Sequence, residues 1–216
     1  MSPTDVTPAD FAAALRAIAQ AVERDQDRLS KLDGAIGDGD HGSTMAQGWT
    51  AAVQAIDGLD AGADPAQQCQ GAAKAFLSAV GASAGPLYAT ALMRGGKAVT
   101  GKTDLDGPAL ADFLEAAATG IQERGKAEVG DKTMLDAWDP AARAARKAAD
   151  TADGPAAVAA AAAEAAEQGL QGTKAMVAQK GRASRLAERS AGHLDPGAAS
   201  AALALRAFAD HLAARG

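Results

Sequence analysis

Prolines at helix start positions are the feature that most constrains the fold of this chain. Thr7-Pro8, Asp64-Pro65 and Asp195-Pro196 each combine a capping side chain with a proline at the first helical position. Gly107-Pro108 and Pro155 mark two further starts. Apolar residues follow at spacings of three and four, which is typical of a helix with one buried face. The chain therefore reads as a series of helices, with no convincing strand.

The expected helices follow from these starts and from the loops between them. We predict helices that start at residue 8, at 41–44, and at 65, 87, 107, 134, 155 and 196. The first is expected to end at about 29 or 32, the one from 87 at 95–96, and the one from 155 towards 179. The helix from 134 is expected to have a kink or a restart at 139–140. This gives about eight helices and no linker between two globular halves. We therefore expect a single all-α domain over residues 1–216, an antiparallel bundle or barrel with a site formed by loops at one end.

Composition supports closely packed helices and excludes several function classes. Hydrophobic residues make up 48% of the chain but aromatic residues only 3%, and alanine supplies much of the difference. The net charge is −6 and no basic stripe is interleaved with aromatic residues, so we expect no nucleic-acid partner. No uninterrupted apolar stretch of about 18 residues occurs, so we expect no membrane span. The single cysteine, Cys69, and the absence of a signal-peptide profile favour a cytoplasmic location.

The segment Leu32–Gly42, LDGAIGDGDHG, is the strongest functional signal. Asp33, Asp38 and Asp40 lie within eight residues among glycines, and hard cations such as Mg²⁺ prefer oxygen ligands. The EF-hand pattern of glycine at position six and glutamate at position twelve fails from either starting aspartate, and no P-loop motif occurs. A solvated acidic turn is the alternative. If the segment is a binding site, we expect it to hold a metal ion together with a phosphate, because the N-terminus of the following helix attracts anions.

Three further glycine-bearing loops stand out, at 81–86, 124–134 and 181–197. Alternate loops of an up-and-down bundle fall at the same end, so these loops and 33–44 are expected to form one pocket. Loop 81–86 suits either a phosphate or a close helix crossing. In 124–134, Lys126, Lys132 and Thr133 are expected to face phosphate, unless the loop is simply solvated. Arg182 is expected to clamp an anion, with a surface salt bridge as the alternative.

Together these motifs resemble the nucleotide-binding L subunit of dihydroxyacetone kinase. The matching segments are Leu32–Gly42, Val80–Tyr88 (VGASAGPLY), Arg124–Met134 (RGKAEVGDKTM) and Lys180–Ser200 (KGRASRLAERSAGHLDPGAAS), in the family's order. The resemblance implies an eight-helix barrel, in agreement with the helix count. One difference is that the family's loop commonly reads Gly-Gly-Ala-Ser-Gly-Pro, whereas the serine here, Ser83, is displaced by one position.

The resemblance also implies roles for individual residues. Metal binding, by two Mg²⁺ ions that bridge the nucleotide phosphates, would fall to Asp33, Asp38 and Asp40. The ADP or ATP cofactor would be contacted by His41, Gly42, Ser43 and Thr44 at the helix start, by Ser83 and Ala84, by Gly125, Thr133 and Met134, and by Arg182, Asp195, Pro196 and Gly197.

The implied activity is phosphoryl transfer to dihydroxyacetone held covalently on a separate K subunit. In one branch of the family ATP is consumed directly by a fused protein. In the other the L subunit keeps ADP, which a phosphohistidine M subunit of the sugar phosphotransferase system rephosphorylates in place. A chain that stops at Gly216 favours the second branch. The alternatives are an ATP-dependent kinase for dihydroxyacetone or a related ketose, a non-catalytic nucleotide sensor that contacts a transcription regulator, and a metal-binding bundle without nucleotide.

Overall fold

The computed structural model describes residues 5–81, 83–151 and 154–215. In these residues the chain forms nine α-helices and two short 3-10 segments, and no strand longer than an isolated bridge between Val6 and Leu105. The elements are α1 (Pro8–Arg24), α2 (Gln26–Ile36), α3 (His41–Asp57), α4 (Pro65–Ala79), α5 (Ala84–Ala98), α6 (Gly107–Gly125), α7 (Leu135–Ala149), α8 (Pro155–Gly172), η1 (Thr173–Ala175), η2 (Arg182–Ser190) and α9 (Pro196–Ala213).

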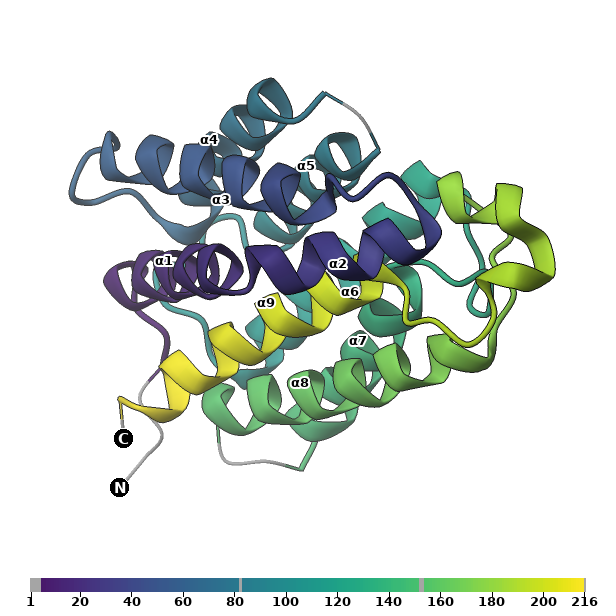
Figure 1. The fold of residues 1–216 in the computed structure, drawn as a ribbon. Helices are drawn as coiled ribbons and strands as arrows, with labels where there is room; N and C mark the ends of the chain where they lie inside the picture. Colours follow the sequence, from purple (N-terminus) through teal and green to yellow (C-terminus); the bar gives the residue numbers. More distant parts are fainter. Residues whose placement is uncertain (1–4, 82, 152–153, 216) are drawn as a thin grey trace.

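The helices close into a ring in chain order (Figure 1). Each helix from α3 to α8 packs on the next, α8 packs on α9, and α1 closes the ring by packing on both α9 and α3. Short connections between successive helices make neighbours antiparallel. This arrangement confirms the predicted all-α antiparallel barrel, while the extent of the domain over 1–216 stays a prediction.

The ninth helix comes from a break that the sequence analysis missed. A single helix was expected from residue 8 to residue 29 or 32, but α1 ends at Arg24 and α2 begins at Gln26. Asp25 between them has φ −102° and ψ 7°, outside the helical range, and its carboxylate accepts from the Arg28 guanidinium. The bend lets α2 lie across α3 and α9 at one end of the barrel. Counted as one bent element, α1 and α2 restore the eight-helix barrel.

Two predicted helix ends are wrong, and at the first of them glycine serves helix packing. Helix α5 continues through Gly95 and Gly96 to Ala98. A Cβ on Gly95 would lie 2.6 Å from the Phe113 ring, and one on Gly96 would lie 2.6 Å from Cys69 Cβ. These glycines therefore allow close crossings of α5 with α6 and α4. At the other site, the helix expected to reach residue 179 ends at Gly172.

Helix α7 runs through Pro140 as one helix, so the restart that was one of the two expectations at 139–140 does not occur. A proline inside a helix frees a carbonyl one turn earlier, here that of Asp136. Gly169 of α8 approaches this carbonyl so closely that a Cβ there would lie 2.0 Å from its oxygen. Helix α8 therefore packs closely on α7 at the turn that precedes Pro140.

The barrel interior is filled mainly by alanine and a few aromatic rings. Phe11 meets Phe113 and Phe208 edge to face, at centroid distances of 5.6 and 5.9 Å. Trp49 lies against Phe76 and Tyr88 in the same manner. These geometries are the favourable ones for aromatic pairs. In the part of the chain that the structure describes, no helix is long and apolar enough to cross a membrane.

Candidate functional site

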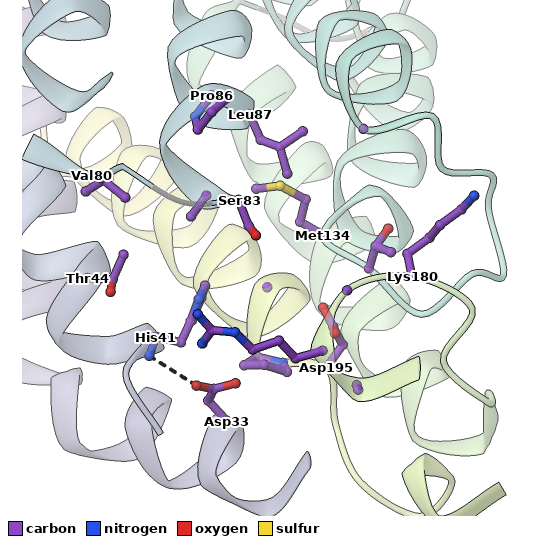
Figure 2. A pocket seen from close by; sticks show the side chains of 18 of the residues that line it. Asp33, His41, Thr44, Val80, Ser83, Pro86, Leu87, Met134, Lys180 and Asp195 are labelled. Atoms are coloured by element: carbon purple, nitrogen blue, oxygen red, sulfur yellow. Dashed lines mark hydrogen bonds between the residues drawn. The ribbon is translucent and has the colours of Figure 1, made fainter. Parts of the chain in front are cut away.

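A cavity of about 560 Å³ opens at one end of the barrel (Figure 2). It is lined by residues from all four glycine-bearing loops, which confirms that these loops meet. Most of the predicted contact residues line it, namely Asp33, Asp40, His41, Thr44, Ser83, Ala84, Gly125, Thr133, Met134, Arg182, Asp195, Pro196 and Gly197. Asp38, Gly42 and Ser43 do not line it.

Asp33 organises the acidic loop from the last turns of α2. Its side chain is buried, and its Oδ2 accepts from the backbone N–H groups of Gly39 (2.9 Å) and His41 (3.3 Å; Figure 2). Its Oδ1 lies so near Gly37 that a Cβ there would be 2.1 Å away. Position 37 therefore requires glycine, and the loop folds around this carboxylate.

Three carboxylates converge at the rim of the cavity. Asp33, Asp38 and Asp40 each offer an oxygen, and these oxygens lie within 4.8 Å of one another. Arg182 of η2 bridges Asp38 and Asp40, at 3.2 Å from Asp40 Oδ1, and both carboxylates raise the pKa of Arg182. A guanidinium thus provides the positive charge that three close carboxylates need. The all-oxygen donor set fits a hard divalent cation.

His41 begins α3 and is tied to the barrel interior. Its Nε2 lies 2.9 Å from Ser200 Oγ of α9, and Ser200 Oγ in turn lies 3.4 Å from the Tyr88 hydroxyl. Burial lowers the pKa of His41, while the charges of Asp33 and Asp40 oppose that shift. Burial also raises the pKa of Tyr88 to about 12. The chain Tyr88–Ser200–His41 therefore fixes the imidazole at the cavity wall.

The remaining residues of the first turn of α3 are placed differently from one another. Thr44 lines the cavity, whereas Ser43 is exposed and its Oγ donates to the Asp40 carbonyl. A Cβ on Gly42 would lie 2.0 Å from the Gln26 carbonyl oxygen. Gly42 therefore allows α3 to approach α2, and this packing brings the N-terminus of α3 to the cavity.

Loop 81–86 is shorter than expected, because α5 begins at Ala84. Ser83 has φ 34°, in the left-handed region, and lines the cavity with Ala84. A Cβ on Gly85 would lie 1.8 Å from the Val80 carbonyl oxygen, so the turn also depends on a close backbone approach. Ala82, the remaining member of this motif, lies outside the described residues.

Loop 124–134 is held by a buried carboxylate that the sequence analysis did not single out. Asp136 is 2% exposed and accepts from the backbone N–H groups of Gly130 (2.6 Å) and Thr133 (2.8 Å). Lys126 is exposed and does not line the cavity. The ammonium of Lys132 does not face outward to a phosphate but donates to backbone carbonyls inside the protein. Local sequence gave no sign of either contact.

Asp195 caps α9 from the cavity floor. Its Oδ2 accepts from the Ala198 N–H at 2.7 Å. Its pKa is raised to about 7, mainly by burial and also by the nearby charge of Asp136, while the Ala198 N–H and the charge of Lys132 oppose the shift. Pro196 and Gly197 follow directly and line the same wall.

The cavity walls differ in chemical character. Leu87, Met134 and Ile121 form an apolar patch, with Leu87 and Met134 on the side away from Asp33 and His41 (Figure 2). The opposite side carries the acidic cluster and the N-terminus of α3. A molecule with an apolar ring and a charged tail fits this division. Fold and site together define a class: an all-helical barrel with a carboxylate-rimmed ligand cavity at one end.

Comparison with known proteins narrows this class. The model of the DAK2 domain matches residues 35–210. The chain is 41% identical over 189 residues to the ADP-binding subunit DhaL of PEP-dependent dihydroxyacetone kinase 1 of Listeria innocua serovar 6a, covering 88% of this chain and 89% of that relative. It is 37% identical over 172 residues to the corresponding subunit of Escherichia coli strain K12, covering 80% and 81%. The chain therefore belongs to the DAK2 family.

Larger relatives match over part of their length. The L-erythrulose 1-kinase of Mycolicibacterium smegmatis is 37% identical over 204 residues, which is 94% of this chain and 35% of that enzyme. The crystal structure of the dihydroxyacetone kinase from C. freundii in complex with AMP-PNP and Mg²⁺ has a TM-score of 0.72 at 21% identity, covering 96% of this chain and 34% of that one. The chain thus spans about a third of these proteins, and the structural likeness confirms the helical barrel fold.

Proposed function

We propose that this chain is the nucleotide-binding subunit of a dihydroxyacetone kinase and holds ADP or ATP in the cavity at the end of the barrel. The observation that carries the proposal is the convergence of Asp33, Asp38 and Asp40 at the rim of a cavity built from four separate loops. The relatives named ADP-binding subunits of PEP-dependent dihydroxyacetone kinases support it, because they match along most of their length.

The division of the walls supports one orientation of the nucleotide. The base would lie against Leu87, Ile121 and Met134, with Gly125 and the segment 195–197 framing it. The phosphates would extend towards Thr44 and the N-terminus of α3, which favours anions. His41, Gly42, Ser43, Ser83, Ala84 and Thr133 remain proposed contacts around this path.

The acidic cluster would hold two Mg²⁺ ions, which supply neutralisation of the charge on the phosphate oxygens when bound. Asp33 is already held by two backbone N–H groups, so one of its oxygens keeps a fixed position. Arg182 pairs with Asp38 and Asp40. We propose that its guanidinium turns to the terminal phosphate when nucleotide is present, because guanidinium pairs with phosphate in a two-pronged way.

The proposed reaction moves one phosphoryl group. The bond between the terminal phosphorus and the β-phosphate oxygen breaks, and a bond to a hydroxyl oxygen of dihydroxyacetone forms as that hydroxyl loses its proton. We propose that a K subunit holds the sugar. A phosphohistidine M subunit then transfers its phosphoryl group from nitrogen to ADP, which stays in place. A transcription regulator as a further partner, and a cytoplasmic location, belong to the same proposal.

Reconstitution tests this function directly. The chain is loaded with ADP and Mg²⁺ and mixed with K subunit, phosphorylated M subunit and dihydroxyacetone, and dihydroxyacetone phosphate is measured. Product that depends on the M subunit, with one ADP retained per chain over many turnovers, supports the proposal. Product formed only from added ATP would favour a direct ATP-dependent kinase. Nucleotide binding without product in either mixture would favour a non-catalytic sensor.

The ketose kinases among the relatives support a second candidate, an ATP-dependent kinase for dihydroxyacetone or a related ketose. The L-erythrulose kinase of Pectobacterium atrosepticum is 34% identical over 197 residues and, like the M. smegmatis enzyme, is matched over about a third of its length. Parallel reactions with dihydroxyacetone and L-erythrulose, each with ATP or phosphorylated M subunit as donor, separate the two candidates.

A further inference from the structure

Lys132 places a charged group where the protein is almost closed to water. The residue is 1% exposed. Its Nζ donates to the carbonyl oxygens of His193 (2.6 Å), Ser190 (2.8 Å), Thr173 (2.9 Å) and Met176 (3.2 Å). An ammonium has three N–H groups, so these four carbonyl oxygens are enough to accept from all of them. The longest contact, to Met176, then shares an N–H group with another carbonyl. The geometry is that of a cation ringed by backbone oxygens.

These four carbonyls belong to two segments that are distant in the chain. One is η1 with Met176, which follows α8, and the other runs from Ser190, the last residue of η2, to His193. The Thr173 carbonyl also accepts from the Met176 N–H at 3.1 Å, within η1. A buried carbonyl without a donor is destabilising, and so is a buried ammonium without acceptors. Each therefore satisfies the other, and the ammonium joins the two segments.

This ring is connected to the cavity through Thr173. While its carbonyl accepts from Lys132, its Oγ1 accepts from the Asp195 N–H at 3.0 Å and donates to the Leu170 carbonyl at 2.7 Å. Asp195 then caps α9, and it lines the cavity together with Gly197. Two hydrogen bonds thus link the buried ammonium to Asp195, and Lys132 is itself among the residues that line the cavity.

The backbone of Lys132 is also held. Its φ is 61°, a left-handed conformation that side-chain-bearing residues adopt rarely. Asp136 accepts from Gly130 and Thr133 on either side, so the loop cannot relax freely. A strained residue held on both sides points to a fixed role for its side chain. The two residues that follow it, Thr133 and Met134, line the same cavity.

We propose that Lys132 is a positioning residue of the nucleotide site: its buried ammonium, ringed by carbonyls, sets the distance between the wall at 133–134 and the wall at 195–197. The inference rests on the proposed function, since it concerns the same cavity. It does not depend on the identity of the sugar or of the phosphoryl donor.

Lys132→Met tests the proposal, because methionine keeps the unbranched apolar stem, one atom shorter, but removes the ammonium. ADP binding in Mg²⁺ is measured by calorimetry well below each variant's unfolding temperature, so that lost stability alone does not change the result. We expect at least about tenfold weaker binding, the size typical of losing a group that orients a ligand site. Lys174→Met is the matched control, since Lys174 is an exposed neighbour of Thr173; we expect its affinity to stay within about twofold.

A second pair covers the case in which Lys132→Met does not fold. Thr173→Val removes the hydroxyl contacts to Asp195 and Leu170, and Thr173→Ser keeps both. We expect about threefold to tenfold weaker ADP binding for the valine variant and wild-type affinity for the serine variant. Wild-type affinity in folded Lys132→Met, or in Thr173→Val where the first does not fold, would overturn the proposal. A wild-type chain that binds no ADP would instead refute the proposed function.

Discussion

Two groups of carboxylates lie in or beside the loops that build the cavity, and they differ in what neutralises or pairs with them. Asp136 and Asp195 lie inside the protein; Asp136 accepts from backbone N–H groups of loop 124–134, and Asp195 accepts from the Ala198 N–H in the first turn of α9. Asp38 and Asp40 near the rim are exposed and form ion pairs with Arg182, which is itself about half exposed. The carboxylates of the inner group have their hydrogen-bond donors within the protein, whereas those of the outer group have oxygen atoms available to a metal ion.

This difference indicates that the two groups of carboxylates have different roles, one in stabilising the loops and the other in binding a ligand. Carboxylates that accept backbone N–H groups fix loop geometry, and removing one leaves those donors unpaired. Carboxylates clustered at a rim repel one another unless a cation joins them. We therefore assign stability and geometry to the inner group, and metal and nucleotide binding to the outer group.

The largest expected effect lies in the outer group. Asp38→Ala removes one of three converging oxygens, so ADP binding in Mg²⁺ should weaken more than about 1,000-fold, beyond the 10–100-fold typical of outer-sphere losses. The thermal unfolding temperature should stay near that of wild type, because Asp38 is exposed. Calorimetry and circular dichroism measure the two quantities. Asp60→Ala, in the turn between α3 and α4, is the control; unchanged ADP affinity in Asp38→Ala would refute the metal assignment.

The next effect concerns pH and the inner group. The pKa of Asp195 is raised from 3.8 to about 7, so between these values the folded chain holds a proton that the unfolded chain releases. Its contribution to stability is therefore full below pH 4 and is lost as pH rises through 7, by up to about 4 kcal/mol. Asp195→Asn keeps the helix cap but does not titrate.

Urea unfolding of wild type and Asp195→Asn at pH 4.5, 6 and 8 measures this loss. The variant should gain stability relative to wild type as pH rises, because only the wild type loses the contribution of the bound proton. Parallel pH profiles for the two proteins would show that Asp195 titrates at its ordinary value in the folded state.

A smaller effect tests how α3 is brought to the site. Gly42→Ala places a methyl group 2.0 Å from the Gln26 carbonyl oxygen and should destabilise the fold by about 1–3 kcal/mol. In Gly34→Ala, the nearest atom lies 3.8 Å from the new carbon, so helix propensity should raise stability by about 0.5–1 kcal/mol. Denaturant titration compares the pair, and equal changes would contradict the close approach of α3 to α2.

The smallest expected effect concerns the contact behind His41. Ser200→Ala removes the hydroxyl 2.9 Å from His41 Nε2, so ADP affinity should fall about fivefold, corresponding to one hydrogen bond of about 1 kcal/mol. Ser78→Ala on α4 is the control, because Ser78 is exposed and does not line the cavity. Calorimetric affinities equal to wild type in Ser200→Ala would show that His41 needs no such support.

The outer group and the fold were accessible from the sequence, and the inner group was not. Asp38 and Asp40 lie within eight residues of Asp33, the buried carboxylate that completes their cluster. Helix starts such as Asp64-Pro65 are local signals as well, and the capping box there confirms one of them. Local signals also explain the errors. Gly95 and Gly96 read as a helix end, although their role is a crossing with distant helices.

Contacts between distant segments were missed because nothing local marks them. Lys132 reads as a loop lysine available to phosphate, but its partners lie 41 to 61 residues later in the chain. Ser200 meets His41 across 159 residues. Such pairings arise only once the barrel closes, so a single sequence carries no sign of them.

The measurement that tests this account most directly is an ADP titration of the wild-type chain, in Mg²⁺ and again with the metal chelated by EDTA. If the rim carboxylates bind nucleotide through metal, affinity in Mg²⁺ should exceed that in EDTA by at least about 100-fold, because three carboxylates then repel the phosphates. Equal affinity in both buffers would contradict the account, and would mean that the cavity holds nucleotide without the carboxylate cluster.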